Sequence, residues 1–454
     1  MKSTLTERIA SAARFIFVVG SLVALSSFVR LVRAQDIVGP APQEMAAPGT
    51  FVIRNARVFT VSGATIENGT VVISQGRITA VGTTATAPAG AQEIDARGLN
   101  VYPGLIDAET NLGLAEIESG APGTIDVAEV GDYNPNAQAW VAVNPHSSHV
   151  EVTRVAGVTT VLSMPRGGIV SGQAAVINLS GTTQRELAMV QTAALVIDFP
   201  RVGGFQFGPP QPISPDAIST RDRRVDELRR LLRDAEAYGK AQDAYARDPK
   251  NIPRPETDLI LAALVPYVRG ERPVMFHADR ERDIRAAVNF AQEMKLKPVI
   301  FGGSDAWKVA SLLKERNVPV VVDSIWGLPL REDDPYDTLY ENPAKLAAAG
   351  VRFAISTGDS GAHVRDLPFQ TGMAVSFGLA HDEALKSITL YPAQILGVAD
   401  RLGSIEVGKI ANLVVTDGDI LDARTNVRHL FIGGRQIPLV SRHTVLNDAF
   451  KDRK

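Results

Sequence analysis

The pattern of hydrophobic and polar positions divides the chain into two kinds of sequence. Residues 51–102 alternate apolar and polar side chains over short runs separated by glycine-containing turns, and the same pattern returns at residues 398–440. Alternation with a period of two is typical of strands that bury one face. We therefore expect both ends of the chain to contribute strands to one small β domain, a β-sandwich.

The middle of the chain, residues 103–397, alternates short β-rich apolar runs with amphipathic stretches of helical spacing. Eight such runs are present, at residues 101–106, 159–162, 174–177, 194–197, 274–276, 299–301, 318–322 and 351–355. Strands that alternate with helices predict a parallel sheet, and eight such units predict an α/β fold with a (β/α)8 TIM barrel. Enzymes with this fold place their chemistry at the C-terminal ends of the strands. The residues that follow each run are therefore the candidates for a site.

The first 34 residues have the pattern of a signal peptide. Basic residues precede an apolar run at residues 15–29, shorter than the ~20 residues that span a bilayer, and a small-residue cleavage site ends at Ala34. Basic residues also follow the run, which leaves open an uncleaved membrane anchor. In either case we expect an exported protein, periplasmic or secreted. Residues 35–50 predict a linker because they are rich in proline and alanine, and residues 441–454 predict a C-terminal tail.

Composition narrows the classes of function. The chain of 454 residues is 45% hydrophobic and 21% charged, which excludes a disordered chain and a polytopic membrane protein. Its net charge of −3 lacks the basic excess of nucleic-acid-binding proteins, so we expect no nucleic-acid partner. Cysteine is absent, so any catalytic metal ion must be held by nitrogen and oxygen ligands.

Four separated motifs carry a resemblance to a known family. They are VYPGLID at residues 101–107, GVTT at 157–160, TLYPAQILG at 389–397 and LGSIEVGKIANLVV at 402–415. In this order they resemble the amidohydrolase superfamily of metal-dependent hydrolases, and most of all its imidazolonepropionase-like members. The resemblance implies a small-molecule substrate and hydrolysis of a carbon–nitrogen bond, non-peptide or dipeptide-like, by a metal-activated water.

The metal site is where this sequence departs from the family. Glu109 and Asn111 stand where the resemblance places two histidines, and Gly302 stands where it places a third. His277 and Asp359 match the expected histidine and aspartate after the fifth and eighth strands. The resemblance therefore implies Glu109, Asn111, His277 and Asp359 as metal ligands and Asp359 as the catalytic proton carrier. Asp198 lies near the place of a bridging ligand after the fourth strand, although its register is not fixed by the pattern.

Two interpretations of this ligand set stay open. One divalent ion such as zinc or manganese fits three oxygen donors and one imidazole, a set that favours manganese, magnesium or calcium more than a histidine-rich set does. Alternatively the site holds no metal, and the protein is a catalytically inactive relative that binds a small ligand or a partner chain. Such a partner is a second copy or a related, active amidohydrolase.

Other polar residues have weaker claims to chemistry. His363 follows Asp359 on the loop after the eighth run and is either a substrate ligand or an ordinary loop residue. His146 and His149 have the spacing of a helical metal pair, but they fit the start of a helix better. The acidic residues between positions 116 and 132 either attract a cationic ligand or form a solvated rim.

Overall fold

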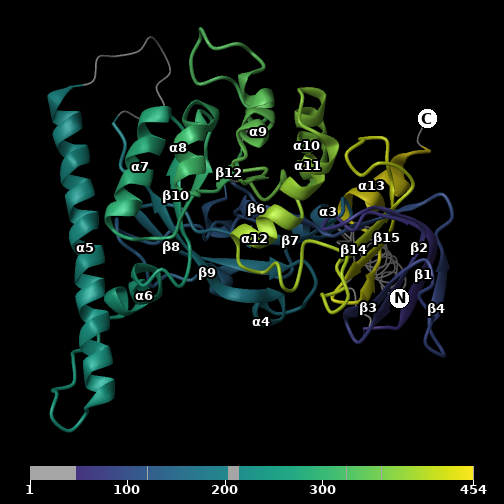
Figure 1. Ribbon diagram of the computed structural model, residues 1–454, viewed down its shortest axis with the longest axis horizontal. Helices are drawn as coiled ribbons and strands as arrows, with labels where there is room; N and C mark the ends of the chain where they lie inside the picture. The colour runs from purple at the N-terminus through teal and green to yellow at the C-terminus, as the bar shows by residue number, and fades with distance from the viewer. Residues whose placement is uncertain (1–47, 120, 203–213, 324, 359, 453–454) are drawn as a thin grey trace, which may run out of the picture. The chain divides into compact units, whose positions relative to one another are not determined.

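The structure is a computed structural model that describes residues 48–119, 121–202, 214–323, 325–358 and 360–452 (Figure 1). These residues all fall within one unit of the chain, Glu44–Lys454. The predicted signal peptide, residues 1–34, and most of the linker lie outside the described residues. Across the described ranges, none of the helices combines the length and the apolar character needed to cross a membrane.

Eight strands form the barrel sheet, and each overlaps one of the eight apolar runs, although the first half of the first run, residues 101–103, belongs to a strand of the other sheet. They are β6 (Leu105–Thr110), β7 (Val158–Ser163), β8 (Val170–Asn178), β9 (Ala188–Asp198), β10 (Val274–Ala278), β11 (Pro298–Gly302), β12 (Val320–Val322) and β13 (Phe353–Ile355). They pair in the order of the sequence from β6 to β13. The predicted TIM-like barrel is confirmed as a nearly closed sheet of eight strands.

The expectation of a wholly parallel sheet is wrong at β8, which runs antiparallel to both β7 and β9. The reason lies in the connection. β7 ends at Ser163 and β8 begins at Val170, whereas a parallel connection needs a dozen or more residues. The chain can therefore only turn back. As a result the N-terminal end of β8, at Val170, lies at the barrel edge where the neighbouring strands have their C-terminal ends.

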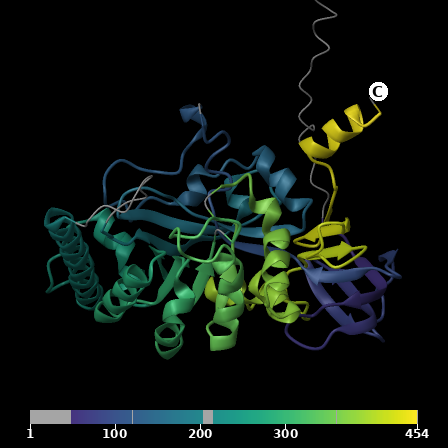
Figure 2. The same cartoon turned by 90° about the horizontal axis from the view of Figure 1, so that it is seen from above.

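Helices cover the outside of this sheet (Figures 1 and 2). They are α2 (Ala139–Ala142), α3 (Ser148–Arg154), α4 (Gln184–Leu187), α5 (Pro215–Arg247), α6 (Leu259–Val268), α7 (Glu281–Glu293), α8 (Ala310–Glu315), α9 (Thr338–Ala349), α10 (Leu367–Ser376), α11 (His381–Ser387) and α12 (Leu390–Ile395), with short 3-10 turns η1 (Pro122–Thr124), η2 (Ala306–Val309) and η3 (Val364–Asp366). The predicted tail contains a further helix, α13 (Arg442–Phe450).

The two ends of the described chain meet in a second, mixed sheet. Its strands are β1 (Phe51–Val58), β2 (Ile66–Ser74), β3 (Arg77–Gly82), β4 (Gln92–Asp95), β5 (Asn100–Pro103), β14 (Leu413–Thr416), β15 (Val427–Ile432) and β16 (Arg435–Ile437). The antiparallel pair of β5 and β14 joins the two halves, with Tyr102 opposite Val414. Side chains from both ends, such as Ile53 and Phe431, share one apolar core. The separate β domain built from terminal strands is therefore confirmed.

The interior of the barrel is packed with apolar side chains and is not a pore. Met275, Val299, Phe301, Val321 and Ala354 contribute to this inner core. The side chains between them, such as Ile300 and Val322, point outward and pack in a separate apolar core with side chains of the helices. Each strand therefore buries both faces, as expected for a barrel that is covered by helices.

Candidate functional site

Polar side chains form a layer directly above the apolar interior of the barrel. Successive side chains of a strand point to opposite faces, so residues two apart share a face. His277 thus follows Met275, Asp323 follows Val321 and Ser356 follows Ala354 on the inner face. These positions lie at the C-terminal ends of β10, β12 and β13, where a barrel of this kind carries its chemistry.

His277 is held between two carboxylates. Its Nδ1 lies 3.0 Å from Oδ1 of Asp198, and its Nε2 lies 3.3 Å from Oδ2 of Asp279. Burial by itself lowers the pKa of His277, but the hydrogen bonds to Asp198 and Asp279 outweigh it and raise the pKa to about 10. With this pKa the ring is protonated at neutral pH and its two N–H groups face the carboxylates. The guanidinium of Arg201, which pairs with Asp198, also lies 3.1 Å from Nδ1. The His277 ring also stacks on Phe301 with 5.0 Å between the ring centroids.

Gly302 leaves the space that this ion pair needs. Its φ is +90°, and a Cβ atom there would lie 2.7 Å from Oδ1 of Asp279 and 3.2 Å from Cδ2 of His277. The Asp279 carboxylate is fixed from the other side, since Ser304 donates to its Oδ1 at 2.9 Å. The absence of a histidine at position 302 is thus matched by an aspartate that occupies the adjoining space.

Glu109 is a buried residue, and only one of its two carboxyl oxygens has a hydrogen-bond partner among the described residues. Its side chain is 1% exposed, and its Oε1 accepts a hydrogen bond from Nη2 of Arg166 at 2.8 Å. Its Oε2 is buried without a hydrogen-bond partner among the described residues. Burial raises the pKa of Glu109, an effect that the neighbouring Arg166 guanidinium partly offsets. Arg166 in turn lies over the ring of Phe301, 5.4 Å from its centroid.

Asp323 is a half-buried carboxyl in the same layer, with its Oδ1 buried, and the sequence analysis did not single it out. Burial raises its pKa well above the usual range, and the negative charges of Glu109 and Asp279 raise it further. Its Oδ1 has no hydrogen-bond partner in the described part of the chain. A clear signal was present in the sequence, because Asp323 directly follows the seventh apolar run, where the fold places chemistry.

Asp107 joins the first and last strands of the barrel beside this layer. Its Oδ1 accepts from the Ser356 hydroxyl at 2.5 Å, and its Oδ2 accepts from the Thr357 hydroxyl at 2.6 Å. Burial raises the pKa of Asp107 to about 6 in spite of these hydrogen bonds. The bonds link β6 to the end of β13 and so hold the segment that carries Glu109 in place.

Comparison with known proteins identifies relatives of this chain. A sequence model described as "Amidohydrolase family" matches residues 279–437. The structure resembles an amidohydrolase from Thermotoga maritima MSB8 with a TM-score of 0.74 and 27% identity, over 86% of this chain and 99% of that one. The chain belongs to the amidohydrolase superfamily. The resemblance expected from the four motifs is therefore confirmed.

Curated relatives agree with this membership of the amidohydrolase superfamily. The chain is 24% identical to the imidazolonepropionase of Maricaulis maris over 78% of its own length and 88% of the relative's. It is also 24% identical to amidohydrolase tasK of Hapsidospora irregularis over 87% of its own length. That alignment spans only 45% of tasK, so the chain matches less than half of that relative.

The structure brings together only some of the residues that the sequence analysis named. Glu109 and His277 belong to one centre, since the charge of His277 lowers the pKa of Glu109. Asn111 is engaged elsewhere: its Oδ1 accepts from the Gly361 backbone N–H at 2.7 Å, and its Nδ2 donates to Glu118 at 3.2 Å. His363 is exposed at the start of η3. Asp359 lies outside the described residues.

The residues present do not fit the metal centre that an amidohydrolase implies. A ligating histidine must offer a lone pair, whereas His277 donates from both nitrogens to carboxylates. One oxygen of Glu109 is taken by Arg166. Within the described ranges, no group of three or more histidine, aspartate or glutamate side chains could hold a metal ion. The predicted divalent ion therefore stays a prediction, and no chemical step is derived through it.

The arrangement has chemical capacities of its own. Arg166 and His277 are fixed cations that can stabilise negative charge on an oxygen. Glu109 and Asp323 are carboxyls whose raised pKa values bring proton transfer closer to neutral pH. Acids and bases in one buried layer, with their pKa values moved apart by different neighbours, are typical of a reaction centre.

Proposed function

We propose that this amidohydrolase-family protein hydrolyses carbon–nitrogen bonds of small, non-peptide or dipeptide-like substrates at a centre formed by Glu109, Asp323, Arg166 and His277. The observation that carries the proposal is the pair of buried carboxyl oxygens, Oε2 of Glu109 and Oδ1 of Asp323, that lack partners among the described residues. An unpaired buried polar atom costs about 1–3 kcal/mol. A bound substrate would provide hydrogen-bond partners for these two oxygen atoms.

The two cations would stabilise the negative charge that develops on the oxygen or nitrogen double-bonded to the carbon under attack. Arg166 supplies N–H donors in this layer, and His277, whose own nitrogens face Asp198 and Asp279, adds positive charge. Both charges act on Glu109. As water adds to the carbonyl or amidine carbon, negative charge develops on the attached oxygen or nitrogen. Fixed donors of this kind are worth about 10²–10³-fold in rate.

The two carboxyls would divide the proton transfers between them. The pKa of Glu109 is held down in part by Arg166, so we assign it the role of base that accepts a proton from the attacking water. The pKa of Asp323 is raised by burial and by two neighbouring carboxylates, so we assign it the role of acid. It donates its proton to the nitrogen that leaves as the carbon–nitrogen bond breaks. Such transfers contribute about 10²–10⁴-fold.

A second candidate function is ligand binding without turnover. It is favoured by one observation, that His277 and Glu109 are already engaged in ion pairs with Asp198, Asp279 and Arg166. In that case the protein binds a small ligand or a partner chain, a second copy or a related active amidohydrolase, through the same end of the barrel.

Hydrolysis assays separate the two candidates. The purified protein is incubated with imidazolone propionate, N-acyl amino acids and dipeptides, with and without added manganese or zinc. We expect turnover that falls about 10²-fold or more in Asp323→Asn and in Glu109→Gln. Glu118→Gln, which contacts Asn111 outside the centre, serves as the matched control and should retain full activity. Binding of these compounds with no turnover under any condition would favour the second candidate.

We also propose that the protein is exported, as the pattern of residues 1–34 supports. Sequencing the N-terminus of protein taken from the envelope of the native host tests this. A start near Gln35 is expected, whereas a chain that retains residues 15–29 would indicate a membrane anchor.

A further inference from the structure

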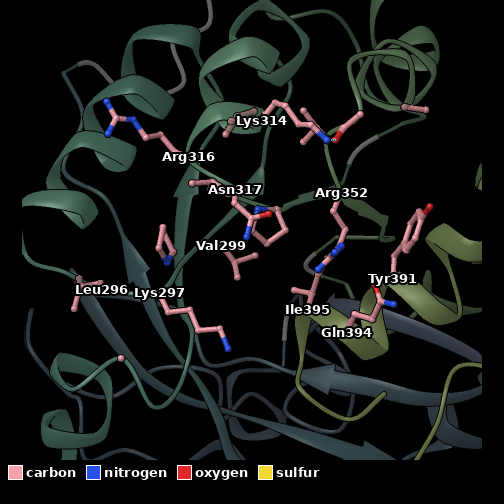
Figure 3. Close-up of a pocket in the computed structure, with 18 of the residues that line it drawn as sticks. Leu296, Lys297, Val299, Lys314, Arg316, Asn317, Arg352, Tyr391, Gln394 and Ile395 are labelled. Atoms are coloured by element: carbon pink, nitrogen blue, oxygen red, sulfur yellow. Dashed lines mark hydrogen bonds between the residues drawn. The ribbon is translucent and has the colours of Figure 1, made fainter. Parts of the chain in front are cut away.

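The opposite end of the barrel contains a cavity that the proposed reaction does not use. It has a volume of about 820 Å³ and is lined by the N-terminal ends of β11–β13 and the turns before them (Figure 3). Val299 lines this cavity, whereas Gly302, three residues further along β11, adjoins His277. Three residues of a strand span about 10 Å. The cavity and the reaction centre are therefore separate places on the same strands.

A repeated turn shapes the cavity. Lys295, Asn317 and Gly350 each have a positive φ, between 51° and 71°, just after α7, α8 and α9. Left-handed residues of this kind end helices and redirect the chain. Because the turns after α7 and α9 are alike, Lys297 and Arg352 occupy equivalent positions two residues further on. They flank the start of β12, and Figure 3 shows both side chains extending into the cavity.

The lining is strongly cationic. Five of its side chains carry positive charge, namely Lys295, Lys297, Lys314, Arg316 and Arg352. Its one acidic side chain, Glu383, is already engaged, since it accepts hydrogen bonds from Lys386 at 2.9 Å and from the Tyr391 hydroxyl at 2.8 Å. Within the part of the chain that the structure describes, Lys297 and Arg352 form no ion pair. The cavity therefore holds positive charge that its own residues do not neutralise.

We propose that this cavity binds the phosphate group of an anionic ligand. Arginine and lysine are the usual partners of phosphate oxygens, and a phosphate group matches several cations better than a single carboxylate does. The amide side chains of Asn317 and Gln394 in the lining can hydrogen-bond the rest of the ligand. The volume lies within the range of about 300–1,000 Å³ that is usual for small-molecule sites.

Calorimetric titration with pyrophosphate and with inorganic phosphate tests the proposal on the intact protein. One pyrophosphate should bind per chain. The double variant Lys297→Ala/Arg352→Ala should weaken binding about tenfold or more, because each lost charge-assisted hydrogen bond is among the stronger contacts of a protein. Lys250→Ala/Arg254→Ala removes the same charge from exposed positions outside the cavity and is the matched control, in which affinity should stay within about twofold.

Vesicles distinguish the source of the phosphate group. Co-sedimentation with phosphatidylglycerol vesicles, but not with phosphatidylcholine vesicles, that is lost in Lys297→Ala/Arg352→Ala would assign the site to a lipid headgroup. Pyrophosphate binding without vesicle binding would assign it to a soluble ligand. The proposal is overturned if neither probe binds, or if binding persists unchanged in the cavity variant, whose folding is checked by its thermal unfolding curve.

Discussion

The two ends of the barrel handle charge in opposite ways. At the C-terminal ends of the strands, Glu109 is buried and His277 is half-buried, and their charges are balanced over short distances by Arg166, Asp198 and Asp279. At the N-terminal ends the cations of the cavity are exposed, and Lys297 and Arg352 have no ion-pair partner among the described residues. The charges at the C-terminal ends depend on close packing against their partners. The charges at the N-terminal ends are free to interact with water and with a ligand.

The difference follows from the connections between strands. The turns before β11–β13 are tight and short, so the side chains that they carry point into solvent. At the other end, Arg166 comes from the connection between β7 and β8 and reaches Glu109 of β6, whereas Asp279 lies in the two-residue connection after β10 and pairs with His277 of that same strand. Burial then makes the electrostatic interactions strong, because the local dielectric constant is low. Substitutions at the two ends should therefore differ in size, in pH dependence and in salt dependence.

The largest effect is expected when the cation beside Glu109 is removed. Arg166→Met leaves a buried carboxylate without its ion-pair partner, which typically destabilises a protein by about 3–5 kcal/mol. Glu109→Gln/Arg166→Met removes both charges and should recover much of this loss. Urea unfolding measures both variants. Arg97→Met, which breaks an exposed pair with Asp95, is the control and should leave the unfolding midpoint unchanged. Equal unfolding midpoints for Arg166→Met and the native chain would show that an ion pair at the C-terminal ends of the strands contributes no more to stability than an exposed one.

The next effect concerns pH. The pKa of His277 is raised from about 6.5 in the unfolded chain to about 10 in the folded one. Its contribution to stability is therefore fully present below pH 6.5 and is lost as the pH rises through 10. A pKa difference between about 6.5 and about 10 corresponds to about 5 kcal/mol. Because the His277 side chain is 24% exposed and solvent screens part of the interaction, we expect the free energy of unfolding to fall by about 3 kcal/mol over this window. His277→Gln should lose most of this dependence, and an equally steep decline in the variant would assign it to other groups.

Much of the fold could be predicted from the sequence because hydrophobic periodicity reports burial directly. All eight barrel strands lie where apolar runs predicted them, from β6 to β13. The direction of β8 could not be obtained from apolar runs, since the pattern of buried residues along a strand is the same in either direction. Only the length of the loop between Ser163 and Val170 carried that information.

The site was less predictable, because its side chains converge from distant parts of the chain. Glu109 and His277 were named from the motifs, but their partners Arg166 and Asp198 lie 57 and 79 residues away in the sequence. The carboxylates beside His277 raise its pKa to about 10, and no local pattern in the sequence reveals the contact with Asp198. Asp323 could have been named from the sequence, since it directly follows an apolar run.

A third effect is expected from adding one methyl group beside the ion pair. In Gly302→Ala the new Cβ would lie 2.7 Å from Oδ1 of Asp279, and overpacking with backbone strain should destabilise the protein by about 2 kcal/mol. Gly408→Ala has a similar φ of +94° with nothing within 4 Å, so it measures the strain alone. Gly350→Ala, at the other end, meets only the flexible end of Lys314. The thermal unfolding temperature of Gly302→Ala should be lower than those of Gly408→Ala and Gly350→Ala. A similar loss in all three variants would show that the positive φ, and not the contact with Asp279, causes the effect.

The smallest effect is expected at the cationic cavity, where the substitution should raise the stability of the protein instead of lowering it. Lys297→Ala/Arg352→Ala removes two exposed charges from a group of like charges, so self-repulsion in the folded state falls. The free energy of unfolding should rise by no more than about 0.5 kcal/mol, the range of exposed substitutions. Raising the salt concentration from about 0.01 M to about 1 M shortens the Debye length from ~30 Å to ~3 Å and should abolish the gain. Urea unfolding at both salt concentrations measures this. A loss of stability that persists in high salt would mean that Lys297 and Arg352 support the fold, as the residues of the opposite end do.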